Sequence, residues 1–156
     1  MPRRSALDPG NLFEVALPDG GLAYGMVIDF PLVAFFDRRF TERPLIANIL
    51  SCPTAFRIWI MRSCLKRTGW PVIGFAAVPE PLSEPPTFYK FDTVSHRFST
   101  YRAQIEIPAT REECLGLEGA AVWNAVHVES RLDDHFAGRP NKWVEQLNPA
   151  RRGSGR

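Results

Sequence analysis

Apolar and polar positions alternate over the first thirty residues in the two-residue period of β-strands. Residues 12–17 place an apolar side chain at every second position, and a second apolar segment follows over residues 22–29. Pro18-Asp19-Gly20-Gly21 separates the two segments, and Asp-Gly supplies the positive φ values that tight hairpin turns need. The pattern therefore predicts a β-hairpin over residues 12–29.

Short runs rich in β-forming residues predict further strands along the middle of the chain. These runs cover residues 32–37, 56–61, 70–75 and 88–92, and residues 97–107 hold another extended piece. Residues 45–50 fit either a short strand or a short helix, and we favour the strand. Four prolines between Pro79 and Pro86 remove backbone donors, so this segment is predicted to be a stiff, polyproline-like connection.

The last third of the chain carries the start and stop signals of helices. Thr110-Arg111-Glu112-Glu113 fits a capping box. A longer helix is predicted over residues 125–137, with Asn124 as its N-cap and Gly138 just past its end. Its apolar stripe consists of Val128, Leu132 and Phe136, and the charged residues outside that stripe are Glu129, Arg131, Asp133 and Asp134. Asn141 is expected to cap a final short turn.

This order of elements, strands first and helices last, indicates an α+β fold. We expect a strongly twisted, mostly antiparallel, barrel-like sheet with the C-terminal helices packed on one face or end. A chain of 156 residues has the size of one domain. We therefore predict a single globular domain over residues 8–147, with a flexible tail at 1–7 and a flexible basic tail at 148–156.

The formal charge of +2 is unevenly distributed along the chain. Five of the 19 basic residues lie in the two predicted tails, which contain no acidic residue. The predicted domain contains the remaining 14 basic residues and 17 acidic residues, so its net charge is −3. A nucleic-acid-binding domain gathers positive charge on a folded face. The charge distribution therefore argues against nucleic acid as the partner.

The three cysteines are widely spaced and form no CxxC pair, which disfavours both a disulfide framework and a zinc site. We expect Cys52, Cys64 and Cys114 to be small buried side chains in a reducing compartment. The N-terminus lacks the apolar segment of a signal peptide, and no apolar run reaches the roughly 18 residues of a membrane span. These features predict a cytoplasmic protein that does not contact membranes.

Known catalytic motifs are missing from the sequence, including GxSxG, HExxH, the P-loop and the dinucleotide-binding glycine fingerprint. His127 and His135 lie two helical turns apart, about 12 Å, which is too far to share a metal ion. His96 lies in a polar stretch without a clear partner. The acidic pairs 112–113 and 133–134 each point about 100° apart on a helix, so capping and solvation explain them better than catalysis. We predict a protein that is not an enzyme, with no catalytic residue, cofactor or metal site.

The four tryptophans could form an aromatic binding platform, but residues of this kind more often fill a core, and we favour the core. They are Trp59, Trp70, Trp123 and Trp143. Trp123 and Trp143 lie near predicted helix ends. These two are therefore expected to be the most exposed of the four.

The hairpin motif Pro9-Gly10-Asn11-Leu12-Phe13-Glu14-Val15-Ala16-Leu17-Pro18-Asp19-Gly20-Gly21-Leu22-Ala23-Tyr24-Gly25 resembles the opening of the bacterial immunity protein 26 family. Shorter matches follow at residues 70–74, 88–90 and 129–132, so the resemblance is expected to cover most of residues 8–147. Asn11 replaces the usual acidic residue of the family, and Ala16 stands where proline is frequent.

The resemblance implies a function in polymorphic toxin systems and interbacterial competition, where such proteins neutralise a cognate toxin domain by binding it. It implies a partner encoded by a neighbouring gene, and it carries over no catalytic residue. For the contact surface we predict Asp133, Asp134 and Trp143, because complementary charge speeds association between proteins.

Two other classes of function stay open from the sequence. One is a small SH3-like barrel that acts on nucleic acid as an endoribonuclease-type toxin, for which His96 and Glu14 are the residues to test. The other is an accessory module that binds a small ligand or DNA. The acidic body of the chain argues against the first, and no specific residue supports the second.

Overall fold

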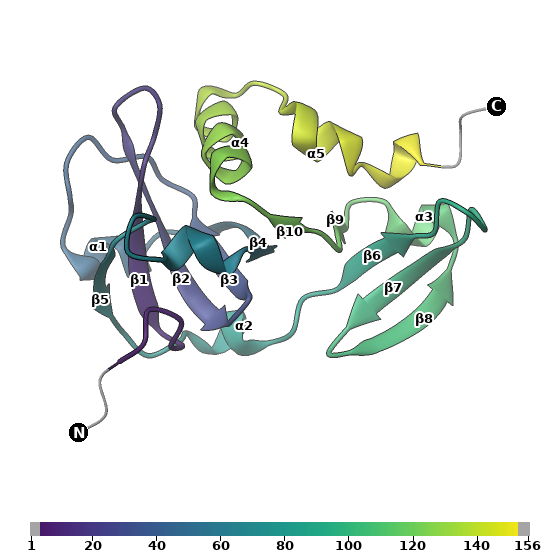
Figure 1. The fold of residues 1–156 in the computed structure, drawn as a ribbon, viewed down its shortest axis with the longest axis horizontal. Coiled ribbons are helices and arrows are strands. Elements are labelled where there is room, and N and C mark those ends of the chain that lie inside the picture. Colours follow the sequence, from purple (N-terminus) through teal and green to yellow (C-terminus); the bar gives the residue numbers. More distant parts are fainter. Residues whose placement is uncertain (1–3, 153–156) are drawn as a thin grey trace.

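The computed structural model describes residues 4–152, which form two β-sheets and a set of C-terminal helices. Figure 1 shows the sheets beside each other, with the longest helix over the first sheet and the last helices reaching toward the second. The first sheet has the strand order β10-β4-β3-β2-β1-β5. The second has the order β8-β7-β6-β9. Apart from the parallel pairs β10–β4 and β6–β9, neighbouring strands are antiparallel.

The six-stranded sheet consists of β1 (Asn11–Ala16), β2 (Leu22–Asp29), β3 (Leu32–Phe36), β4 (Thr54–Ile60), β5 (Val72–Phe75) and β10 (Val122–Trp123). The four-stranded sheet consists of β6 (Phe88–Phe91), β7 (Phe98–Arg102), β8 (Ile105–Ala109) and β9 (Glu118–Gly119). The helices are α1 (Ile46–Leu50), η1 (Arg62–Leu65), α2 (Glu80–Ser83), α3 (Arg111–Cys114), α4 (Ala125–Ala137), α5 (Lys142–Gln146) and η2 (Pro149–Arg151). No helix within residues 4–152 is both long and apolar enough to cross a membrane.

Side chains of the first sheet are buried on both of its faces, because successive residues of a strand point to opposite sides. On one face Phe13 packs in a cluster with Val128 and Leu132 of α4. On the other face Leu12 packs in a second cluster with Ile49 of α1. The sheet is therefore the middle layer of the fold, between α4 and α1.

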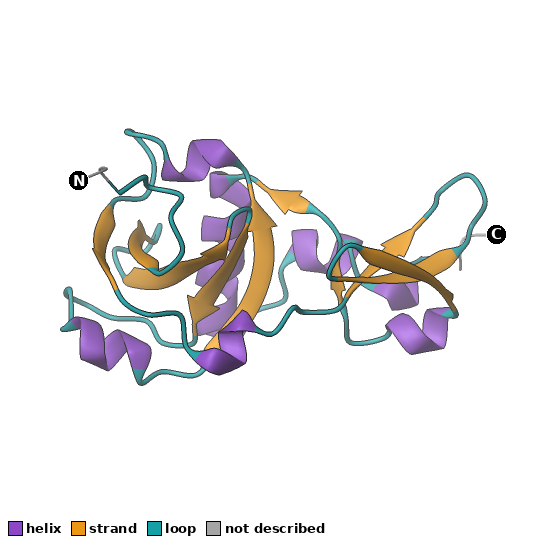
Figure 2. Cartoon of the chain, turned by 90° about the horizontal axis from the view of Figure 1, so that it is seen from below, coloured by secondary structure: helices purple, strands orange, loops and turns teal. Residues whose placement is uncertain are grey.

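The predicted α+β class with C-terminal helices is confirmed, but the strands do not form one barrel-like sheet. They form two sheets, and neither is closed or strongly curled (Figure 2). The division falls between β5 and β6, in the proline-rich segment 79–86. Because prolines cannot donate to a β-ladder, this segment cannot extend the first sheet, and β6 begins a second one.

The local predictions have different outcomes. The hairpin over 12–29 is confirmed as β1 and β2, and the extended piece at 97–107 is the hairpin of β7 and β8. Residues 45–50, predicted as a strand, instead contain α1, because Ile46, Ile49 and Leu50 meet the sheet at helical spacing. The polyproline-like connection is interrupted by α2, which buries Leu82.

Helix capping agrees with the sequence signals. Thr110 and Glu113 form the predicted capping box at the start of α3. Asn124 accepts a hydrogen bond from the His127 amide at the start of α4, and Gly138 ends that helix in a left-handed conformation. The Asn141 side chain caps α5. These caps satisfy amides and carbonyls that have no partner inside the helix.

The predicted tails lie partly outside the described residues, at positions 1–3 and 153–156. Within the described part, the Arg4 side chain donates a hydrogen bond to Asn11, and η2 places Pro149 in a buried position. The division into one domain with two flexible tails stays a prediction.

A charged network ties the segment after β3 to the first sheet. Arg43 donates two hydrogen bonds to the Glu14 carboxylate, at 2.8 and 3.1 Å, and the Tyr24 hydroxyl donates a third at 2.8 Å. The hydrogen bond from Arg43 is the main reason why the pKa of Glu14 lies below its ordinary value of 4.5, although partial burial acts in the opposite direction. The ionised form of Glu14 is therefore the one that stabilises the fold.

We expect Glu14→Gln to lower the free energy of unfolding by about 1.5 kcal/mol at neutral pH. A folded-state pKa below the unfolded value gives stability that is complete above the unfolded value and is lost as the pH falls through the folded value. The difference between the two proteins should therefore shrink as the pH falls below about 4.5. Urea denaturation at several pH values measures it. A constant difference down to low pH, or an equal loss in the exposed control Glu42→Gln, would contradict the assignment.

Candidate partner interface

The histidines are not brought together by the fold. His127 stacks on Trp143, His135 places Nε2 2.7 Å from Oδ1 of Asp37, and His96 lies beside Phe91 in the turn between β6 and β7. Among residues 4–152 no group of three or more His, Cys, Asp or Glu side chains is placed to hold a metal ion.

The two residues named for a ribonuclease also lie apart in the fold. Glu14 belongs to the first sheet, where Arg43 and Tyr24 engage its carboxylate. His96 follows a strand of the second sheet. Their positions give no support to an acid/base pair between them.

The cysteine side chains fit structural roles. Cys64 and Cys114 are buried, whereas Cys52 is only partly buried, and all three are free thiols. Burial raises the pKa of the Cys64 thiol to about 11 and also raises the pKa of Cys114. A nucleophilic cysteine needs a lowered pKa, so these two thiols lack the chemistry of a reactive site.

Arg131 is the charged residue whose place the helical pattern of α4 did not predict. The pattern put it on the solvent side, but only 8% of the residue is exposed. Its guanidinium lies 3.7 Å from the ring centre of Phe56 and 5.0 Å from that of Trp123, and it pairs with the Glu118 carboxylate. Arg131 thus joins α4 to both sheets, because Phe56 belongs to β4 and Glu118 to β9.

Asp133 and Asp134 close the turn between α4 and α5. Arg139 bonds to Asp133 at 3.2 Å and to Asp134 at 3.0 Å, and Asn141 donates to Asp134 at 2.9 Å. The hydrogen bond from Asn141, followed by that from Arg139, lowers the pKa of Asp134. Both side chains are 22% exposed. A partner would therefore meet a paired cluster of charges instead of two free carboxylates.

Trp143 lies at the junction of α4, α5 and β10. Its ring stacks on His127 at 3.6 Å between ring centres, and the Lys142 ammonium lies 4.6 Å from its centre. A groove of about 160 Å³ beside it is also lined by Val122. Val122 is 52% exposed, and Val126, in the first turn of α4, is 71% exposed. Partly exposed aromatic and apolar groups therefore gather at this junction.

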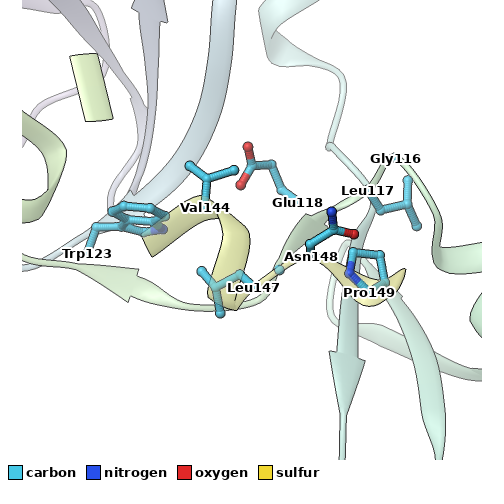
Figure 3. Close-up of a pocket in the computed structure, with 9 residues that line it drawn as sticks. Gly116, Leu117, Glu118, Trp123, Val144, Leu147, Asn148 and Pro149 are labelled. Atoms are coloured by element: carbon cyan, nitrogen blue, oxygen red, sulfur yellow. The ribbon is translucent and has the colours of Figure 1, made fainter. Parts of the chain in front are cut away.

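A second groove, of about 240 Å³, runs between α5 and β9. Figure 3 shows Trp123 at one end of this groove and Leu117 and Pro149 at the other. Trp123 was expected to be among the more exposed tryptophans, but only 5% of it is exposed. Its strand pairs with β4, which places the ring against Arg131 and in the core cluster under α4.

The fold and this surface together define an α+β protein whose apolar and aromatic groups gather at the β10–α4–α5 junction. The family model described as immunity protein 26 matches residues 8–100, more than half of the chain. The chain belongs to the immunity protein 26 family, and membership implies an immunity protein that acts against a toxin. Such proteins are typically not enzymes.

The family match confirms the resemblance carried by the hairpin at Pro9–Gly25. It ends at residue 100, so it does not include the expected extension to residue 147. No curated protein and no solved structure matches the chain.

Proposed function

We propose that the protein neutralises a cognate toxin domain by binding it directly. The observation that carries the proposal is the family match over residues 8–100. We further propose that the toxin is encoded by a neighbouring gene, and that binding occurs in the cytoplasm without nucleic acid or membrane as a partner. In this proposal the protein supplies a binding surface, and the toxin supplies the chemistry that is blocked.

The proposed contact surface is the β10–α4–α5 junction, with Trp143 at its centre. Aromatic side chains that pack into a partner provide much of the binding free energy in protein interfaces. Trp143 is already held by His127 and Lys142, so it loses little conformational freedom on binding. We include Asp133 and Asp134 as a cluster paired with Arg139, which can still steer a basic partner.

This surface lies on the segment that follows the family match. The matched residues, 8–100, contain β1 to β6 and the first part of β7, whereas β10, α4 and α5 come later in the chain. The proposal therefore places Trp143 and the acidic pair on the part of the chain that the family model does not describe.

Growth of a bacterial host tests the protective function. Expression of the neighbouring toxin gene alone should stop growth, and co-expression of this protein should restore it. A neighbouring gene whose product is harmless, or a toxin that still stops growth in the presence of folded immunity protein, would contradict the proposed function. Protection without a physical complex would contradict direct binding.

We expect Trp143→Ala to weaken toxin binding by about 2 kcal/mol, roughly thirtyfold in Kd. Isothermal titration calorimetry with the purified toxin domain measures the change. Phe75→Ala is the matched control, because Phe75 is an exposed aromatic residue on β5, at the opposite edge of the first sheet. Equal affinities for both variants would remove Trp143 from the proposed surface.

The acidic pair is tested in the same titration by changing Asp133 and Asp134 together to Lys. This change should weaken binding and reduce its dependence on salt, since electrostatic attraction is screened by ions. The double change to Asn separates the two roles, because Asn removes the charge and keeps hydrogen-bonding capacity toward Arg139. Unaltered affinity and salt dependence in both variants would exclude the pair from the interface.

A further inference from the structure

A cleft lies between the two sheets. Its volume is about 690 Å³. The lining residues are Ile28, Asp29, Phe30, Pro31, Leu32, Trp59, Ser83, Pro85, Pro86, Phe88, Tyr101, Ala103 and Gln104. They come from the end of β2 and the start of β3 with the turn between them, from β4, from α2 and the prolines after it, and from the second sheet with its β7–β8 turn. The cleft thus exists because the chain forms two sheets instead of one.

Aromatic rings form the walls of the cleft. The Trp59 ring lies 4.5 Å from that of Phe88 and stands nearly perpendicular to that of Tyr101, at 5.6 Å and 88°. Trp59 points away from the core under α4, because its neighbours Ile58 and Ile60 fill that core. The Lys90 ammonium lies 4.3 Å from the centre of Tyr101. One ring of the wall therefore already interacts with a cation.

Asp29 is the single charged residue that lines the cleft within the described part of the chain. It is exposed, and no salt bridge or side-chain hydrogen bond to its carboxylate is present among the described residues. Two acidic residues of the neighbouring second sheet and its preceding segment differ in this respect. Glu84 pairs with Arg102, and Glu106 pairs with Lys90. The cleft therefore combines aromatic rings with one carboxylate that has no counterion among the described residues.

We propose that this cleft receives a basic side chain of the toxin, an arginine or a lysine. The occupant follows from charge complementarity with Asp29 and from the attraction of cations to aromatic faces. Arginine fits better than lysine, because its planar guanidinium stacks on aromatic rings while it pairs with a carboxylate. The inference rests on the proposed function, since it names one contact within the proposed complex.

The cleft and the contact surface around Trp143 are related through the neighbouring strands β4 and β10. Val122 of β10 lies opposite Trp59 in the β10–β4 pairing, and it also lines the groove beside Trp143. We therefore expect one partner to contact both the β10–α4–α5 junction and the cleft, since β10 and β4 are adjacent in the first sheet.

The cleft can be tested without the toxin by nuclear magnetic resonance. N-acetyl-arginine amide is titrated into ¹⁵N-labelled protein, and N-acetyl-citrulline amide serves as the uncharged probe of nearly the same shape. We expect arginine amide to shift the Trp59 indole and the Tyr101 amide with a Kd on the order of a few millimolar. Citrulline amide should bind at least about fivefold more weakly.

Asp29→Asn should abolish the preference for arginine amide over citrulline amide. Asp19→Asn is the matched control, because Asp19 lies in the β1–β2 turn and pairs with Arg39. The control should keep the preference. Equal binding of the two probes to the unchanged protein, or shifts confined to residues outside the cleft, would overturn the inference.

The complex with the toxin supplies the second readout. Asp29→Asn should weaken toxin binding about tenfold, whereas Asp19→Asn should not. A toxin complex that is unaffected by Asp29→Asn would overturn the inference and leave the proposed function standing. Binding of arginine amide by a protein that forms no toxin complex would overturn the proposed function and, with it, the occupant named here.

Discussion

Replacing Phe13 by alanine should lower the free energy of unfolding by about 4 kcal/mol, the largest effect expected from a single change in this protein. Phe13 is completely buried between the first sheet and α4. Its ring stacks on Trp70 at 5.4 Å and meets the edge of Phe35 at 5.6 Å. Gly25, opposite Phe13 on β2, leaves room for this ring. Removing the ring therefore loses apolar burial and leaves a cavity that rigid strands cannot close.

Urea denaturation measures this loss, and Phe75→Ala is the matched control. Phe75 is 62% exposed on the edge strand β5, where the Arg4 guanidinium lies over its ring at 4.2 Å. The control should lose less than about 1 kcal/mol. Similar losses in the two variants would show that Phe13 is not part of a tightly packed core.

The second largest effect is expected from Glu118→Ala, at about 3 kcal/mol. The change removes the carboxylate that pairs with Arg131 and leaves the guanidinium buried without a counterion. Removing one partner of a buried ion pair costs more than the pair itself contributes, because the remaining charge cannot recover its hydration. Contacts with Phe56 and Trp123 compensate only part of this loss.

Glu106→Ala is the control for this prediction. Glu106 pairs with Lys90, and both side chains are about half exposed, so water replaces the lost partner. Its loss should be below about 1 kcal/mol. Restoration of stability by the double variant Glu118→Ala with Arg131→Met would support the explanation, since methionine carries no charge. A loss in Glu118→Ala no larger than in Glu106→Ala would contradict it.

The parts of the fold that local signals determine were predictable from the sequence. The β1–β2 hairpin depends on alternating apolar residues and on Asp19-Gly20, and α4 on the caps Asn124 and Gly138. The helix within residues 45–50 was not predictable, because a short apolar run fits both the helical and the strand periodicity. Tertiary packing decides between the two. The division into two sheets depends on pairing between strands that are far apart in the sequence. The one local feature at the division is the group of prolines before β6.

The candidate surface was less predictable, because exposure depends on the tertiary environment. Trp143 is partly exposed as expected, whereas Trp123 is buried because β10 joins the first sheet. Trp59 was assigned to the core, yet the separate second sheet makes it a wall of the cleft. The pairing of the acidic residues at 133 and 134 with Arg139 follows from the turn after α4. The sequence did contain a signal for the burial of Arg131. This residue lies three positions after Val128 and one before Leu132, at the border of the apolar stripe.

Direct binding between this protein and the toxin is tested by the mass of their complex. The protein and the toxin domain encoded beside it are purified separately, mixed in equal amounts, and analysed by size-exclusion chromatography with light scattering. We expect one peak whose mass equals the sum of one copy of each protein. Two separate peaks at the masses of the individual proteins, at micromolar concentration and with an active toxin, would contradict it.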